Sequence, residues 1–325
     1  MTVARALAQW AHAYRATPDD LALAERALAV ASAARAHQRG VTAPLPDAAR
    51  RAAMAHVLDF DDLHTDTTTH ISVVTDPAVL AAGGGARAYL AGAGVMARLG
   101  AMLGRCHHAA GRHATCTAGA PAAAVAAGLA PGLDVTGLAT AMALAVPAAG
   151  GGQEAFGAHG KSLQVGFAAE AGVRAARLAR AGATTDPRVL EAWLKRVGGQ
   201  PAADFPASPA VPRGLAAKLL PCCYAMQRPI AALREVRDQV RGVVTAVTVT
   251  TPAGTVHPLV ARVHADLLPG EIGSLLDGRV SPRIALADGS EVHTEPALPD
   301  GPTWTSAAEV LRKHFAYIPY EGQEA

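Results

Sequence analysis

Small apolar residues recur at helical spacing through the first two hundred residues, and this pattern constrains the fold more than any other feature. The chain contains 77 alanines but only three Trp, five Tyr and five Phe residues. Alanine is the strongest helix former, and its small side chain lets neighbouring helices approach closely. The pattern therefore predicts a mainly α fold with close helix packing, and it argues against an all-β architecture.

The pattern changes after the Pro-rich segment 199–214, which we interpret as a domain boundary. Beyond it we expect a helix near 225–239, strands at 243–250 and 280–287, and an Asp288-Gly289 hairpin turn into 291–295. The sequence thus predicts a large all-helical domain over 1–200 and a smaller α+β domain over 215–304. A last helix, 306–315, is expected to complete the helical domain as part of 305–325. The helices expected before the boundary are two within 4–39, then 47–58, 77–82, 86–103, 115–130, 134–149, 163–182 and 187–197.

The charge balance is even, with 29 Lys and Arg against 27 Asp and Glu, and no block of like charge is present. We therefore expect no nucleic-acid partner and no anionic membrane surface as a partner. No apolar run reaches the ~20 residues needed to span a bilayer, so we expect a soluble cytoplasmic protein. The four cysteines show no CxxC spacing, which favours reduced thiols over a disulfide framework or a zinc ribbon.

Two nucleotide-binding motifs are matched only formally. Gly92-x-Gly94-x-x-Ala97 resembles a dinucleotide fingerprint and Gly160-Lys161-Ser162 resembles part of a phosphate loop, but neither follows a predicted strand. We expect the first to serve close helix contact instead.

A polar stretch between two apolar helices carries many metal-ligand side chains. Carboxylates and imidazoles at this density could hold a divalent cation, so a metal site is one hypothesis for the stretch. The Asp-rich spacing also resembles that of terpene synthases, but a chain so poor in aromatics is unsuited to lining an isoprenoid cavity. The residues concerned are His56, Asp59, Asp61, Asp62, His64, Asp66 and His70.

Four separate segments carry polar residues that an Ala-rich core does not otherwise need. Their side chains are suited to acid/base work on an anion, because imidazole moves protons near neutral pH and an ammonium group holds a carboxylate. Each residue also has a structural explanation, as a loop carboxylate, a core histidine or a solvated lysine, and spacing alone leaves both open. The five candidates are Asp59, His70, His113, Lys161 and Lys218.

The order of these segments resembles the MmgE/PrpD family, which includes 2-methylcitrate dehydratase, cis-aconitate decarboxylase and iminodisuccinate epimerase. The motifs that carry the resemblance are LDFDD…TH, GRHATCTAGA, GKSLQVGFAAEAGVRAARLA and KLLPCC, and LLDG at 275–278 extends it. The resemblance implies an all-helical domain with a smaller α+β lid, usually in a homodimer with the site between the domains. From the residues themselves we expect no cofactor, because no nucleotide loop is present, and no metal, because two lysines can supply the positive charge.

Carried over residue by residue, the resemblance assigns Asp59 and His70 to the first active-site loop. His113, Lys161 and Lys218 match the second, third and fourth segments. Lys161 and Lys218, with Ser162 and Gln164 of the third segment, are expected to bind substrate. Three positions depart from the family pattern, namely Leu63, Ile71 and Pro269, and they point to a specialised substrate.

The resemblance and the residues together predict a metal-free lyase acting on a small di- or tricarboxylate or a related polar acid. One of His70 and His113 would remove a proton α to a carboxylate, and dehydration, by a hydro-lyase, is the expected outcome. Epimerisation or isomerisation and decarboxylation stay open, because they pass through the same kind of carbanion as dehydration. A non-catalytic homologue that keeps the pocket is a further alternative.

Overall fold

The computed structural model describes residues 1–33, 39–218, 220, 222–252, 263–268 and 281–293. This part of the chain divides into two compact units, one within Met1–Ala217 and one that begins at Lys218. The protein is mostly helical with a small sheet, as the composition predicted. The predicted helix at 306–315, the LLDG segment and Pro269 lie outside the described residues.

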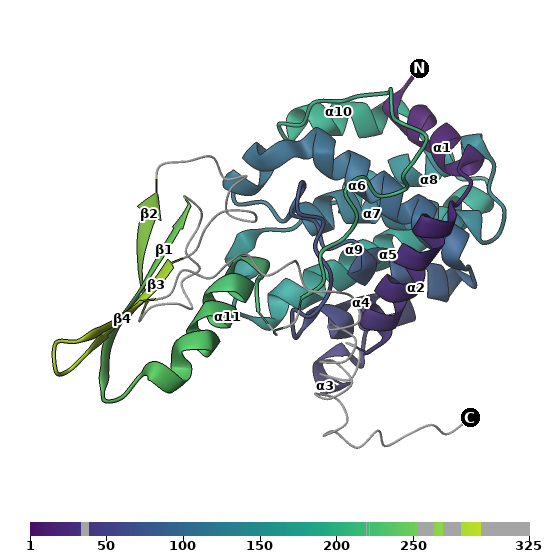
Figure 1. Cartoon of the computed structure of the whole chain (residues 1–325). Helices are drawn as coiled ribbons and strands as arrows, with labels where there is room; N and C mark the ends of the chain where they lie inside the picture. Colours follow the sequence, from purple (N-terminus) through teal and green to yellow (C-terminus); the bar gives the residue numbers. More distant parts are fainter. Residues whose placement is uncertain (34–38, 219, 221, 253–262, 269–280, 294–325) are drawn as a thin grey trace. The chain divides into compact units, whose positions relative to one another are not determined.

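The first unit consists of helices joined by loops (Figure 1). Each helix expected before the boundary has a counterpart, with ends shifted by a few residues. The helices are α1 (Val3–Ala13), α2 (Pro18–Ala33), α3 (Arg39–Thr42), α4 (Asp47–His56), α5 (Ser72–Ala82), α6 (Ala86–Ala109), α7 (Ala114–Leu129), α8 (Val135–Ala145), α9 (His159–Arg180) and α10 (Arg188–Arg196).

Helix α7 lies inside this unit and packs against α5, α6, α8 and α9 (Figure 1). Small residues make this possible: a Cβ on Gly92 of α6 would lie 2.6 Å from the Cβ of Ala126 in α7. A Cβ on Gly172 of α9 would collide with the Cβ of Ala123, which is also in α7. Close packing of backbones thus replaces large side chains in the core, and Gly92 serves helix contact as expected.

Two of the shifted helix boundaries have a clear structural cause. Helix α5 begins at Ser72, so Pro77 lies inside it and does not open it. The earlier start is stabilised by Asp62, whose Oδ1 accepts the backbone N–H groups of Ile71 (3.2 Å) and Ser72 (3.1 Å). Helix α6 runs to Ala109 across a kink at Gly104, where φ is +65°.

The Pro-rich segment 199–214 packs on the helical unit. The Arg98 side chain is buried and donates to the carbonyls of Ala210 (2.8 Å) and Pro206 (2.9 Å), and it stacks over the Trp10 ring. The segment is therefore bound to the helices that precede it, and the division between the two units falls after Ala217.

The second unit contains α11 (Gln227–Val236) and a sheet of β1 (Val244–Pro252), β2 (Val263–Leu268), β3 (Ser281–Leu286) and β4 (Glu291–His293). The strand order is β2-β1-β3-β4, with β1 and β2 parallel and the other pairs antiparallel. The predicted turn at Asp288-Gly289 is confirmed, with Gly289 at φ +85°. Strand β2 was not predicted from the sequence.

Among the described residues, no helix combines the length and apolar character that crossing a bilayer requires. The four cysteines, all of which the structure describes, form no disulfide, as their spacing indicated.

Candidate active site

The loop that follows α4 positions the first carboxylate. The Asp59 N–H donates to the carbonyl of His56 at 3.1 Å, and Asp59 adopts φ +57°, a left-handed conformation that Asp tolerates better than most residues. The loop then folds back, with a 2.8 Å bond from the His64 N–H to the carbonyl of Thr69. This reversal brings His70 back beside the end of α4.

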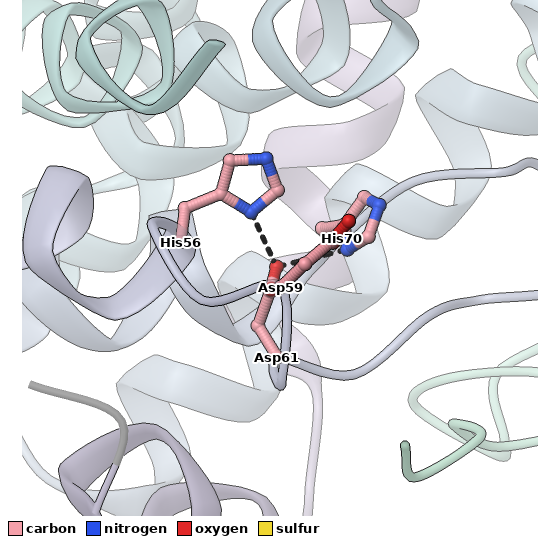
Figure 2. A group of neighbouring side chains, drawn as sticks. All are labelled: His56, Asp59, Asp61 and His70. Carbon is pink, nitrogen blue, oxygen red and sulfur yellow. Dashed lines mark hydrogen bonds and ion pairs between the residues drawn. The ribbon is translucent and has the colours of Figure 1, made fainter. Parts of the chain in front are cut away.

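Asp61 lies between two imidazole rings (Figure 2). Its Oδ2 is 2.8 Å from Nδ1 of His56 and 2.8 Å from Nδ1 of His70. His56 and Asp61 are fully buried, whereas the His70 side chain keeps 12% exposure. One buried carboxylate oxygen therefore faces both rings, and of the two, His70 is the one that solvent can reach.

Lys161 contributes a positive charge beside these groups. It lies in the first turn of α9, and its Nζ is 2.6 Å from Oδ2 of Asp59. The two side chains are 21% and 15% exposed, so the pair is partly shielded from water. Lys161 Nζ also lies 5.6 Å from the centre of the Phe156 ring. Ammonium and carboxylate are thus held together at the edge of the histidine cluster.

His113 completes the cluster from the N-terminus of α7. Its backbone N–H donates to the carbonyl of Gly151 at 3.0 Å. Its ring centre is 5.9 Å from that of His56 and 6.4 Å from that of His70. Burial, together with the neighbouring histidines and Lys161, lowers the pKa of His113 well below its usual range. The ring is therefore neutral at pH 7.

The two other residues expected to bind substrate are engaged within the protein. Gln164, one turn after Lys161, contacts Nδ1 of His113 at 3.0 Å. The Ser162 hydroxyl is buried and donates to the carbonyl of His159 in its own helix at 3.1 Å. That either residue binds substrate stays a prediction.

Lys218 is fully buried and is the first residue of the second unit. The structure brings Asp59, His70, His113 and Lys161 together, whereas the approach of Lys218 to them stays a prediction.

The polar stretch after α4 divides into two sets of residues. Asp62 caps α5. His64 bonds Thr67 and the carbonyl of Pro212, and Asp66 pairs with Arg213 at 3.1 Å. These three hold the loop in place and do not face the cluster. His56 does face it, although the sequence indicated His56 only as a metal ligand; the signal was its position three residues before Asp59.

A cation is the other group that this cluster could hold. One ligand atom from each of His56, Asp59, Asp61 and His70 lies within 4.8 Å of the other three (Figure 2). Imidazole and carboxylate ligands suit divalent transition metals. However, the ammonium of Lys161 already neutralises Asp59, which lowers the affinity of the cluster for a second positive charge. That the site works without a metal stays a prediction.

Comparison with known proteins adds a family to this geometry. The chain matches the model of the MmgE/PrpD N-terminal domain over residues 21–195. This match covers all of α4 to α9, and therefore every residue of the cluster. In the comparison with curated proteins, no match was found. Because the matched region is more than half of the 325 residues, the chain belongs to the MmgE/PrpD family.

Proposed function

We propose that this protein is a lyase that removes a proton α to a carboxylate and dehydrates a small di- or tricarboxylate. One observation carries the proposal: an ammonium group and two histidines from three separate segments lie in one polar cluster. The family supports the class of enzyme, since it includes lyases and related enzymes.

Each part of the cluster matches a step of that chemistry. When an α-proton leaves, negative charge develops on the oxygens of the adjacent carboxylate, and an ammonium group nearby stabilises it. Lys161 is suited to this role because Asp59 fixes its Nζ at 2.6 Å while leaving it partly exposed. A histidine can accept the proton near neutral pH, and His70 is the more exposed of the two rings that face Asp61.

We include Lys218 as a second cation for the substrate. Support comes from the chain itself: Leu63, in the Asp-rich loop, pairs by backbone hydrogen bonds with Ala216. Ala216 lies only two residues before Lys218. A substrate with two or more carboxylates would give each lysine a partner. With two ammonium groups present, the reaction needs no metal to stabilise the developing charge.

The proposal is tested by following the α-proton directly. Malate, citrate, 2-methylcitrate and related acids are first screened by thermal shift, because a ligand at 100 times its Kd stabilises the folded state by about 2.7 kcal/mol. Each acid that stabilises the protein is then incubated with it in D2O and followed by proton NMR. We expect the α-proton signal to decrease and signals of an alkene product to appear. For malate or citrate these are olefinic protons, and for 2-methylcitrate they are a methyl singlet on the new double bond.

Other outcomes separate the alternatives. Loss of the α-proton signal without olefin indicates epimerisation or isomerisation, and release of CO2 indicates decarboxylation. Stabilisation without any exchange indicates a binding protein, and it would overturn the proposed chemistry.

A further inference from the structure

The hydrogen bonds of Gln164 identify which end of its amide is the NH2 group. Its Oε1 accepts the N–H of Gly152 at 3.1 Å, and its Nε2 lies 3.2 Å from the carbonyl oxygen of Gly152. A backbone N–H only donates and a backbone carbonyl only accepts, so the reverse orientation would break both bonds. Nε2 is therefore a donor to every group that it contacts.

The second group in contact with this NH2 is Nδ1 of His113, at 3.0 Å. Because an amide NH2 offers no lone pair, Nδ1 must accept, and the proton of the neutral ring must be on Nε2. The Cys116 Sγ is 3.3 Å from the same Nδ1, and burial raises the pKa of this thiol, which keeps it protonated as a second donor. Both contacts select the same tautomer.

The backbone around Gln164 is shaped for this contact. Gly151 has φ +143°, and a Cβ there would lie 2.7 Å from the Cβ of Cys116 and 3.1 Å from Oε1 of Gln164. The Gly151 carbonyl also accepts the N–H of His113. Three segments thus form a socket that holds Nδ1 of His113 against two donors, and only glycine fits at its narrowest point.

We propose that Gln164 is a positioning residue that fixes the Nε2–H tautomer of His113, so that His113 donates a hydrogen bond to the substrate and is not the base. Among the described residues no hydrogen bond engages Nε2 of His113, which leaves this N–H for a ligand. Full transfer of the Nε2 proton would create an imidazolate, so the ring stabilises a developing oxyanion without giving up its proton. The role in catalysis rests on the proposed function, and it leaves the α-proton to His70.

The tautomer is measured in the free protein by two-dimensional NMR that correlates the ring protons and nitrogens of 15N-labelled histidine. We expect a non-protonated Nδ1 on His113 in the wild type. In Gln164→Glu a carboxylate oxygen replaces the donor, so a proton should appear on Nδ1. Gln153→Glu is the matched control, because Gln153 contacts Nδ1 of a different residue, His108, at 3.1 Å.

A protonated Nδ1 in wild-type His113, or an unchanged His113 spectrum in a folded Gln164→Glu variant, would overturn the assignment. If Gln164→Glu does not fold, Gln164→Met removes the donor without adding charge. Because the Cys116 thiol still donates to Nδ1, Gln164→Met is combined with Cys116→Ala. His113 should then populate both tautomers, and an unchanged spectrum in this double variant would again refute the assignment.

The donor role is tested by D2O exchange on an acid that the wild type turns over. Asparagine supplies an N–H but cannot accept a proton at neutral pH, so His113→Asn should exchange at least about tenfold faster than His113→Ala. At His70, the proposed base, substitution by Asn and substitution by Ala should lower the exchange rate by the same factor. Equal rates for the two His113 variants would overturn the donor role. Should no acid be turned over by the wild type, the proposed function fails while the NMR result on Gln164 still stands.

Discussion

Asp62 should make the stability of this protein fall as the pH rises from about 4 to 6. Its carboxyl group is fully buried, and burial raises its pKa to about 6 despite the hydrogen bonds from Ser72 and Ile71. The unfolded chain has a pKa near 3.8 at this position. Between these values the unfolded state loses its proton while the folded state keeps it, so folding becomes less favourable.

The shift of roughly two pKa units corresponds to about 3 kcal/mol, at about 1.4 kcal/mol for each unit. The cost is small at pH 4, grows through pH 5 and is nearly complete at about pH 7. Asp62→Asn keeps an oxygen for the N–H groups of Ile71 and Ser72 and offers an NH2 to the Ser72 hydroxyl. It has the shape of the protonated carboxyl group and cannot ionise. The stability of Asp62→Asn relative to the wild type should therefore rise by up to about 3 kcal/mol between pH 4 and pH 7.5.

Urea unfolding of both proteins, followed by far-ultraviolet circular dichroism at several pH values, measures this difference. Asp47→Asn is the matched control. Although burial opposes it, the hydrogen bonds and charges of Arg51 and Arg50 lower the pKa of Asp47, so this variant should lose stability relative to the wild type as the pH rises through 4. A difference between Asp62→Asn and the wild type that stays constant within about 0.5 kcal/mol across the range would refute the reasoning.

Three further predictions concern the site. His70→Ala should lower kcat by about 100-fold or more with little loss of stability, because general-base catalysis contributes ~10²–10⁴, and steady-state kinetics with urea unfolding measure both. Lys161→Ala should chiefly raise KM, whereas Lys195→Ala, which removes an exposed lysine of α10, should leave KM unchanged; equal effects would contradict a substrate role for Lys161. Turnover should survive exhaustive chelation, and a complete loss that added metal reverses would instead assign the His56 cluster to a cation.

The helices of the first unit could be predicted because their signals are local. Apolar periodicity and Ala content act within a few turns of each helix, and these helices form as expected. The predicted start of α5 was wrong because the residue that caps this helix lies outside the helix and its immediate flank. The N–H groups of Ile71 and Ser72 are satisfied by Asp62, about ten residues earlier, and this partner outweighs Pro77 as a start signal.

The candidate site shows the same difference between what local sequence signals predict and what contacts between distant residues determine. Residue type and motif order singled out Asp59, His70, His113 and Lys161, because acid/base chemistry needs those groups wherever they lie. The sequence by itself could not show that His56 shares Asp61 with His70, since that contact depends on the loop folding back onto α4.

The sequence also could not show the contacts of Gln164. From the order of the motifs we expected Gln164 to bind substrate. Only the tertiary structure brings its amide between the backbone of Gly152 and the ring of His113. The physical reason is that a side chain's identity determines which protons it can donate or accept, whereas its partners are determined by packing between segments far apart in the chain.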